Sequence, residues 1–443
     1  MLIVWLLLSI AVILIAILKL KLNPALALVL GSFVMGGVSG LGLTVTAKTI
    51  ESGFGNLMTG IGLPIGFGVI LGQLLSDCGG AKKIATTMVR ATSKKYALYA
   101  LGLTAFLLSI PVFYDVTFVI LIPLGIAISR ETGKPLPYTI GAMVIGASTA
   151  HTLVPPTPNP LAAASILHFD LGIMVIVGMV IGLIAATITM KVYFKLLDRG
   201  FWNKEKDETG NLDLNDTVTY SDKSPSFILS LVPILLPVIC ILLGTVVGAM
   251  TKNVPFIITL ISNKTVALFL GVLSAYAVAS VSMTKKQMDD AATEALKACG
   301  IVLLITGAGG SFGAVISKTG LADALALSIK SVSASPIIAL LIAFGIAALF
   351  RIALGSGTVA SITAMTIMAS VASTLGIHPV WIAIACLSGS LSCGHVNDSG
   401  FWVTTNLSGY TITGGLKSYT LCGFMIAVLS LIMAIFGAMF IPI

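Results

Sequence analysis

Long apolar segments, separated by short polar ones, make up almost all of this 443-residue chain. A helix needs about 20 mainly apolar residues to cross the hydrocarbon core of a bilayer. The pattern predicts spanning segments over residues 2–19, 23–45, 60–77, 137–168, 171–196, 227–250, 265–282, 298–317, 379–410 and 418–441. Because helices satisfy all their own backbone hydrogen bonds inside lipid, we predict an all-α polytopic membrane protein.

Two further apolar stretches, at about 97–129 and about 335–375, are too long for one helix. Each is interrupted near its middle by polar residues or by glycine and proline. Each could form two spanning helices or a re-entrant hairpin that ends inside the membrane. We predict re-entrant hairpins, whose non-helical ends must be covered by protein or line a water-filled cavity.

The chain also repeats itself. The segment GQLLSDCGGAKKIA at 72–85 returns 241 positions later as GAVISKTGLADALA at 313–326. The same offset places residues 113–117, in the first hairpin, on residues 354–358 in the second. A further slip of three residues aligns His151 with His395. A repeated apolar chain with polar breaks at matching places is typical of secondary transporters.

We therefore predict two repeats joined by a linker. Residues 1–197 form the first repeat, with its hairpin and a broken helix at 137–168. Residues 227–443 form the second, with a broken helix at 379–410. The polar, mixed-charge segment 198–226 between them is predicted to be a cytoplasmic linker.

The basic residues indicate the orientation, since lysine and arginine favour cytoplasmic loops. We place the N-terminus outside and treat both hairpins as re-entrant. Of the 25 basic residues, nineteen then lie on the cytoplasmic side, five lie outside, and Arg351 sits at a hairpin end. Each half crosses the membrane five times, so the second repeat is predicted to be inverted relative to the first, with both chain termini outside.

The composition agrees with a membrane protein. Only 9% of the residues are charged, against about 25% in a typical soluble domain. The net charge of +8 is explained by basic cytoplasmic loops, so no nucleic-acid partner is expected. The six cysteines are scattered without metal-ligand spacing, and we predict no zinc site and no cofactor.

The end of the first hairpin carries Tyr114, Asp115 and Thr117. An aspartate at the centre of a membrane helix costs about 2.5–3.5 kcal/mol on insertion scales. Asp115 is therefore a candidate proton carrier or cation ligand, and the alternative is a helix cap that faces a basic partner. We expect Tyr114 and Thr117 to contact the substrate.

The end of the second hairpin has the groups that bind an anion. Glycines let backbone N–H groups approach a ligand closely, and helix N-termini favour negative charge. Arg351 could bind a carboxylate through two hydrogen bonds, or it could extend to the membrane surface. The candidate substrate-binding residues here are Arg351, Gly355, Ser356, Gly357 and Thr358.

The first broken helix contains His151 and Asn159. Proline lacks an N–H and clashes with the preceding turn, so a cluster of prolines ends a helix. We expect His151 to take part in proton coupling and Asn159 to bind substrate. The helix is broken by Pro155, Pro156, Pro158 and Pro160.

The second broken helix places His395, Asn397 and Asp398 between Gly394 and Gly400. Ionisable residues inside a membrane mark functional sites more often than not, and histidine titrates near neutral pH. We expect His395 and Asp398 to take part in proton coupling and Asn397 to bind substrate. The alternative is that these polar groups only hold helices together.

Five segments resemble the gluconate permease (gluconate:proton symporter) family of the ion transporter superfamily. They are IGFGVILGQLLSDCGGAKKIATT, FYDVTFVILIPL, AHTLVPPTPNPLA, RIALGSGTVA and GHVNDSGFW. The resemblance implies uptake of gluconate, related sugar acids or D-serine. It also implies an elevator-type transport domain that carries both hairpins, and a scaffold that usually forms a homodimer.

Two positions depart from the family pattern. The family has the sequence PPHPGP after the first histidine, where this chain has PPTPNP at 155–160. The usual glutamate of the first hairpin is Asp115. A lost histidine and a shorter acid leave open a different hydroxy acid, such as glycerate.

The predicted function is import of gluconate or a related small hydroxy or sugar acid by proton symport across the cytoplasmic membrane of a bacterium. The coupling ion is H⁺, with Na⁺ as the alternative, and D-serine or glycerate are alternative substrates. A membrane-embedded metalloenzyme and a passive channel are more remote alternatives, and the chain has no HExxH motif. We predict that the protein is not an enzyme.

Overall fold

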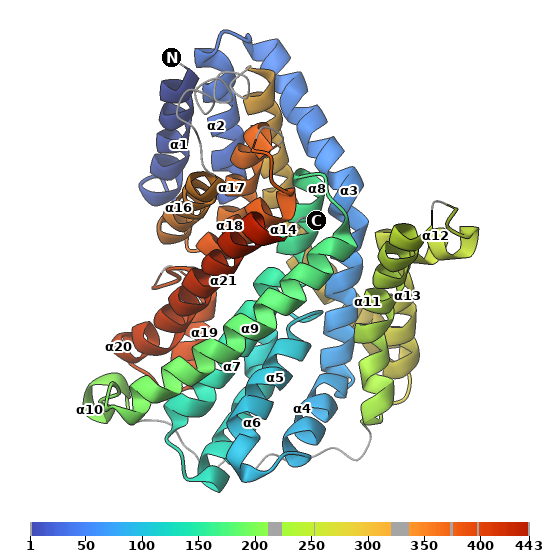
Figure 1. The fold of residues 1–443 in the computed structure, drawn as a ribbon, viewed down its shortest axis with the longest axis vertical. Helices are drawn as coiled ribbons and strands as arrows, with labels where there is room; N and C mark the ends of the chain where they lie inside the picture. Colours follow the sequence, from blue (N-terminus) through green and yellow to red (C-terminus); the bar gives the residue numbers. More distant parts are fainter. Residues whose placement is uncertain are drawn as a thin grey trace.

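The computed structural model describes residues 2–210, 224–251, 253–319, 336–372, 375–396 and 398–441. These residues form helices throughout (Figure 1), apart from one isolated β-bridge between Glu208 and Tyr410. The prediction of an all-α chain is confirmed. Among the described helices, five are long and apolar enough to cross a membrane, or six if the bent pair α12 and α13 counts as one span.

The helices of the first half are α1 (Leu2–Leu18), α2 (Pro24–Val38), α3 (Leu43–Asp77), α4 (Gly80–Arg90), the 3-10 turn η1 (Lys94–Tyr96), α5 (Ala97–Leu108), α6 (Tyr114–Thr132), α7 (Leu136–Leu153), α8 (Pro158–Ile166), α9 (Leu171–Asp198) and α10 (Lys204–Asp207). Those of the second half are α11 (Phe227–Met250), α12 (Phe256–Ser262), α13 (Lys264–Ala279), α14 (Lys285–Lys318), α16 (Pro336–Leu354), α17 (Gly357–Ala372), α18 (Pro379–Leu391), α19 (Ser399–Leu407), α20 (Ile412–Gly415), the short π-helix η2 (Leu416–Thr420) and α21 (Leu421–Phe440).

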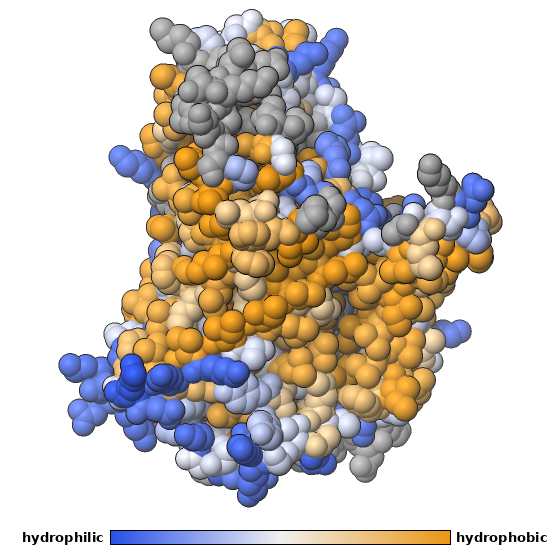
Figure 2. Space-filling view, in the orientation of Figure 1, coloured by the Kyte–Doolittle hydropathy of each residue, from blue (hydrophilic) through white to orange (hydrophobic). Residues whose placement is uncertain are grey.

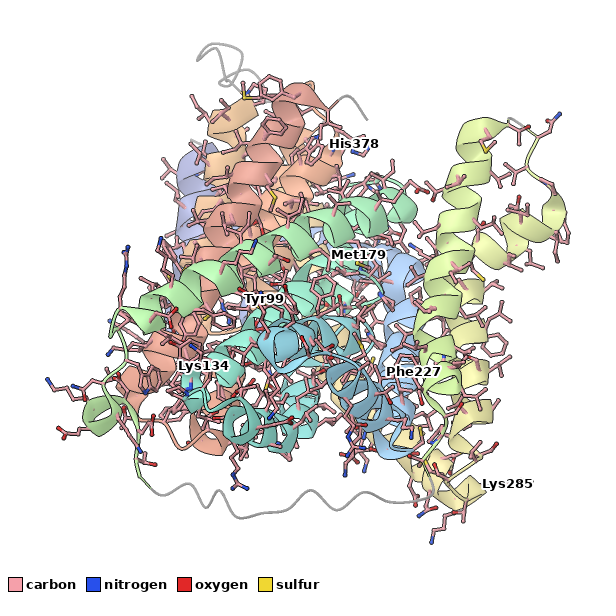
Figure 3. The ribbon with its side chains drawn as sticks, turned by 60° about the horizontal axis from the view of Figure 1, so that its bottom comes forward. Tyr99, Lys134, Met179, Phe227, Lys285 and His378 are labelled. Carbon is pink, nitrogen blue, oxygen red and sulfur yellow. The ribbon has the colours of Figure 1, made fainter. Side chains whose placement is uncertain are left out.

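An apolar band crosses the face shown in Figure 2, and hydrophilic residues gather below it. The long helix α9 contributes to this band. Its exposed apolar side chains include Ile176, Val180, Ile184 and Ile188. A wide apolar belt on the outside of a protein is the surface that lipid covers. In Figure 3, Lys134 and Lys285 lie toward the lower edge and His378 toward the upper edge, so the α6–α7 turn and the start of α14 share one end of the molecule.

Two helices extend well beyond the predicted segments. The predictions at 23–45 and 60–77 left a gap in which α3 in fact runs without interruption. In that gap Thr46, Gly53 and Leu57 are buried while Lys48 and Glu51 are exposed. An amphipathic stripe of this kind continues a helix even where the mean hydropathy falls.

Helix α14 likewise starts at Lys285 rather than at residue 298. Its start is marked by a capping box, in which Thr284 and Gln287 each bind the other's backbone N–H. This motif satisfies two of the free N–H groups at a helix start. Both predicted boundaries were wrong because they were set by mean hydropathy. The actual helix ends depend on the amphipathic pattern in α3 and on the capping box in α14.

The repeat seen in the sequence is also a repeat of helices. Helices α8 and α19 are offset by 241 residues at both ends, and α3 and α14 by 241 or 242. Helix α9 has its counterpart in α20, η2 and α21 together, which begin 241 residues after it. The stretch 97–129 contains α5 and most of α6, and 335–375 contains α16 and α17. Helices α3, α8 and α9 therefore recur at a nearly constant spacing in the second half.

The equivalent helices α3 and α14 run antiparallel. The hydroxyl of Ser311 donates to the carbonyl of Ile50 at 2.8 Å, near the start of α3. The hydroxyl of Ser282, just before α14, donates to the carbonyl of Cys78 at 2.9 Å, just after the end of α3. The start of α3 therefore lies beside the later part of α14, and the end of α3 lies beside the start of α14. Small residues at the crossing bring the two backbones close together.

The close crossing predicts that Gly53→Ala destabilises the protein. A Cβ at Gly53 would lie 2.9 Å from the carbonyl oxygen of Gly310 and 3.0 Å from the Cα of Ser311. Overpacking of this kind costs about 1–3 kcal/mol, so the thermal midpoint of the detergent-purified protein should fall. The matched control is Gly55→Ala on the same helix, where a Cβ would have no atom within 4 Å. Equal midpoints for the two variants would contradict the close crossing.

Candidate functional site

An ion pair between Arg351 and Asp398 is buried at the end of the second hairpin. The two side chains are 7% and 8% exposed, and Nη2 of Arg351 donates to Oδ2 of Asp398. Nη1 of Arg351 donates to the carbonyl of Gly355 at 2.7 Å. Arg351 therefore points inward and caps the end of its own helix, and it does not extend to the membrane surface.

Asp398 also begins helix α19. Its Oδ1 accepts the backbone N–H of Gly400 at 3.0 Å, as an N-cap carboxylate does. A buried carboxylate is tolerated only when it is paired and hydrogen-bonded. Asp398, which lies in the predicted second helix break, therefore caps the start of α19 and neutralises the charge of Arg351.

Tyr419, on the π-helix η2, completes this group, and the sequence did not single it out. Its hydroxyl donates to Oδ2 of Asp398 at 2.6 Å and accepts from Nη2 of Arg351 at 3.3 Å. A tyrosine near the start of a predicted span is common at membrane interfaces, so hydropathy gave no reason to choose it. Its position in η2 is informative, because π-helical turns occur often at functional sites.

The end of the first hairpin contacts the broken helix of the second half. The hydroxyls of Tyr114 and Thr404 are 2.6 Å apart, and the ring of Tyr114 meets that of Tyr419 edge-on at 5.5 Å. Oδ2 of Asp115 accepts from the hydroxyl of Ser399 at 3.4 Å. Within the described part of the chain, Asp115 has this one hydrogen bond and no ion pair. In this cluster Asp398 is held by an ion pair and several hydrogen bonds, whereas Asp115 has one long hydrogen bond.

Glycines keep the backbone close to these side chains. A Cβ at Gly394 would lie 2.6 Å from Oδ2 of Asp398, and one at Gly400 would lie 2.7 Å from the hydroxyl of Tyr419. Gly355 has a φ of +72°, a conformation that side chains disfavour. The predicted Gly394 and Gly400 thus make room for the cluster as well as flank the helix break.

The two predicted histidines differ in their surroundings. The ring of His395 lies with Nε2 3.1 Å from the carbonyl of Ile352, and its own carbonyl accepts the N–H of Asp398. His151 packs edge-on against Phe113 at 5.7 Å, and its buried Nδ1 has no hydrogen-bond partner in the described part of the chain. His395 thus contacts the ion-pair group through its backbone carbonyl, and His151 contacts Phe113 at the end of the first hairpin.

The first break packs against the first hairpin end. Thr157 bridges the break by donating to the carbonyl of Val154 at 2.7 Å. A space of about 10 Å³, room for about one water, is lined by Gly68 of α3 and by residues of both segments. Those residues are Pro111, Val112, Phe113, Pro156, Thr157 and Pro158. Phe113 thus contacts the first helix break, and the next two residues, Tyr114 and Asp115, contact the polar cluster.

The remaining predicted residues lie around this group. The hydroxyl of Thr117 and Oδ1 of Asn159 are buried and have no hydrogen-bond partner within the ranges that the structure describes. The hydroxyl of Ser356 accepts the N–H of Val359 at 3.4 Å, within α17. Gly357 lies beside Arg351, Thr358 is half-buried on α17, and Pro160 is buried in α8. Asn397 lies outside the described residues. Pro155 and Pro156 form the gap between α7 and α8.

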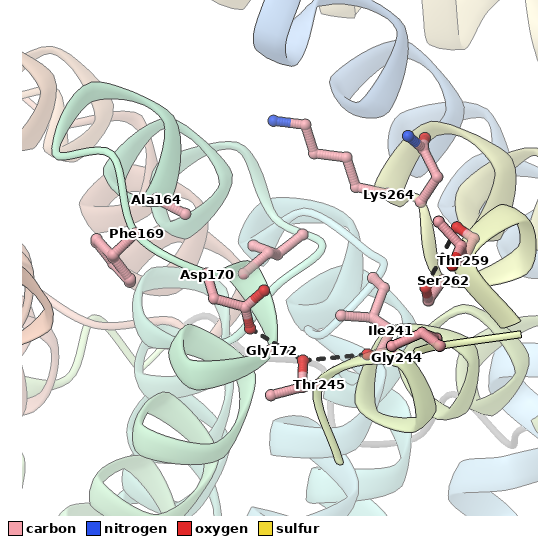
Figure 4. A pocket seen from close by; sticks show the side chains of 13 residues that line it. Ala164, Phe169, Asp170, Gly172, Ile241, Gly244, Thr245, Thr259, Ser262 and Lys264 are labelled. Carbon is pink, nitrogen blue, oxygen red and sulfur yellow. Dashed lines mark hydrogen bonds between the residues drawn. The ribbon is translucent and has the colours of Figure 1, made fainter. Parts of the chain in front are cut away.

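Larger cavities lie elsewhere in the described part of the chain. One of about 450 Å³ separates the α8–α9 turn from α11 and the α12–α13 bend (Figure 4), and Asp170, Thr245 and Lys264 line it. Another of about 290 Å³ lies among α3, α8, α14 and α17, and Thr366 lines it. Neither is lined by a predicted site residue. In the described ranges, no group of three or more His, Cys, Asp or Glu side chains could hold a metal ion.

Comparison with known proteins identifies the family. The family model for GntP family permeases matches residues 1–440. An uncharacterized permease of Haemophilus influenzae is 34% identical and covers 91% of this chain and 85% of its own. The high-affinity gluconate transporter of Escherichia coli is 32% identical and covers 89% of this chain and 90% of its own. The D-serine transporter DsdX of the same organism is 32% identical over 90% and 89% of the two chains.

Solved structures share the fold. Neisseria gonorrhoeae MtrF, described as one of a class of antimetabolite efflux pumps, superposes with a TM-score of 0.64. It is 13% identical and covers 90% of this chain and 84% of its own. The YdaH transporter of Alcanivorax borkumensis has a TM-score of 0.57 at 14% identity, over 88% and 87% of the two chains. The buried polar cluster thus lies in a transporter fold, and the chain belongs to the GntP permease family as a multi-pass membrane transporter.

Proposed function

We propose that this protein imports gluconate or a related small hydroxy or sugar acid by proton symport across the cytoplasmic membrane. Relatives at 30–32% identity are named as transporters of gluconate, L-idonate and D-serine. These compounds share a carboxylate and at least one hydroxyl. The observation that carries the proposal is the buried Arg351–Asp398 pair at the meeting point of the hairpin ends.

In this proposal Arg351 binds the substrate carboxylate. Its Nε–H is buried and has no hydrogen-bond partner among the described residues, which leaves a donor for an incoming acid. The hydroxyl of Tyr419 bonds to Arg351, and the ring of Tyr114 packs against that of Tyr419. In this proposal both hydroxyls pair with hydroxyls of the substrate. A site that hydrogen-bonds substrate hydroxyls discriminates strongly against analogues that lack them, because its own polar groups are then left unpaired.

Asp115 is the proton carrier in this proposal. Asp398 accepts from Arg351, Tyr419 and a backbone N–H, so both of its carboxylate oxygens are already hydrogen-bonded. Asp115 has one weak hydroxyl donor and is only partly covered. Asp115 is therefore the carboxylate whose oxygens are freer to take part in proton transfer.

The antiparallel α3 and α14 support two further parts of the proposal: inverted repeats, and an elevator-type motion of the hairpins against a scaffold. The shared end of Lys134 and Lys285 supports a cytoplasmic position for both, with the chain termini outside. The homodimer that the family resemblance implies stays a prediction.

Reconstituted protein should accumulate labelled gluconate in liposomes when the lumen is alkaline, in the absence of sodium. An uncoupler should abolish the accumulation, because the proton gradient drives it. Competition by L-idonate, glycerate and D-serine would rank the substrate class. Accumulation that needs sodium and ignores the uncoupler would replace H⁺ with Na⁺, and equilibration without accumulation would indicate a channel.

Asp115→Asn should lose proton-driven accumulation and keep exchange of labelled for unlabelled substrate. The amide keeps the shape of the side chain but binds no proton, and exchange needs no net proton movement. Both activities are measured in the same liposomes. Proton-driven accumulation that survives in Asp115→Asn would contradict the assignment of the proton to this residue.

Arg351→Met should lower stability, since losing one partner of a buried ion pair costs about 3–5 kcal/mol. The double variant Arg351→Met/Asp398→Leu should recover most of the thermal midpoint, because no buried charge remains, and should still fail to transport. Lys297→Gln is the control: it breaks an exposed pair with Glu294 at 3.0 Å, and exposed pairs contribute little. Full transport by the double variant would exclude Arg351 from binding the substrate.

A further inference from the structure

The segment that follows α9 folds back onto the chain between α19 and α21. The N–H of Thr209 donates to the carbonyl of Gly409 at 2.8 Å, and that of Thr411 donates to the carbonyl of Asp207 at 2.9 Å. Figure 1 shows α10 beside α20 at the end of α9. The start of the predicted linker is therefore a docked element of the fold.

A buried ion pair anchors this segment. Asp207 is completely buried and Lys417 is 24% exposed. Oδ2 of Asp207 accepts from Nζ of Lys417 at 2.7 Å and from the N–H of Asn203 at 2.7 Å. Nζ of Lys417 also donates to the carbonyl of Phe201 at 3.0 Å. A buried carboxylate with these partners is costly to uncouple, so the position of Lys417 is fixed by the linker.

Lys417 and Tyr419 belong to the same five-residue π-helix, η2. Lys417 is held by Asp207, and Tyr419 is held by Asp398 and Arg351. Thr420, the last residue of η2, donates to the carbonyl of Gly394 beside the same ion pair. One short helix thus connects the docked linker to the polar cluster.

We propose that Asp207 and Lys417 are positioning residues for Tyr419, so that the start of the linker sets the geometry of the Arg351–Asp398 pair. This inference rests on the proposed function of that cluster. Within the described residues, neither Asp207 nor Lys417 is hydrogen-bonded to the cluster, so they act through η2. When the pair is broken, η2 loses its outer anchor and the Tyr419 hydroxyl is no longer held on Asp398.

A double-mutant cycle in the liposome uptake assay tests this. Asp207→Asn and Tyr419→Phe should each reduce the uptake rate about tenfold, the size expected for one hydrogen bond to a charged group. The double variant should also lose about tenfold, because Asp207 acts only through Tyr419. A loss of about a hundredfold would show independent effects and overturn the proposal.

Trp202→Phe is the matched control. Trp202 packs on Tyr410 with ring centroids 4.7 Å apart, in the same docked segment, and the substitution leaves the ion pair intact. Its uptake should stay within about twofold of wild type, as for substitutions away from key contacts. If Trp202→Phe lowers the uptake rate as much as Asp207→Asn does, the docking of the whole segment is responsible. The specific role of the Asp207–Lys417 pair is then wrong.

Hydrogen exchange gives a readout that does not depend on transport. Peptides over residues 412–424 should exchange faster in Asp207→Asn than in wild type or Trp202→Phe, because η2 opens more easily. Unchanged exchange there overturns the positioning role. If the wild-type protein transports no organic acid, the proposed function is rejected. The hydrogen-exchange result then decides by itself whether Asp207 positions η2.

Asp207→Asn leaves the Lys417 ammonium without its carboxylate, which can prevent folding. In that case Asp207→Leu/Lys417→Met, which leaves no buried charge, replaces it in the cycle and in the exchange experiment. The expectation is the same, because this variant also removes the anchor of η2.

Discussion

The ion pair between Arg351 and Asp398 sets the arrangement around it. Two charges with side chains under a tenth exposed are tolerated only when they are paired and hydrogen-bonded. That requirement fixes the end of α16, where Arg351 binds Gly355, and the start of α19, where Asp398 caps the helix. It also explains the glycines, since side chains at Gly394 and Gly400 would occupy the space of the charged and phenolic groups.

The pair belongs to one half of a repeated chain. With the offset of 241 residues, Arg351 corresponds to Ile110 and Asp398 to Thr157. The first half instead contributes Asp115 and Tyr114, which reach across to Ser399 and Thr404 of the second. The two halves thus build a single cluster with different chemistry from each side.

The sequence singles out residues that are unusual in an apolar segment. Asp115 and Asp398 were chosen because charge is costly in lipid, and Arg351 because it lies beside the glycines of the second hairpin end. The structure brings all three into one cluster. Tyr419 was not chosen, since a tyrosine near a span end has an ordinary explanation at the membrane interface. His151 was chosen as the match of His395, yet it packs on Phe113 away from polar partners. Sequence spacing aligned the two histidines without placing them in the same environment.

By itself the sequence determined the membrane class, the repeated order of segments, the helix breaks at the prolines and at Gly394–Gly400, and the family. These follow from hydropathy, from the missing N–H of proline, and from motifs that are local in the chain. Only the tertiary structure decided that Arg351 faces Asp398, that Tyr419 joins them, and that Asp207 is buried against Lys417. These pairs are 47, 21 and 210 residues apart. Which charges meet over such separations depends on how the helices pack, and side-chain chemistry alone does not specify it.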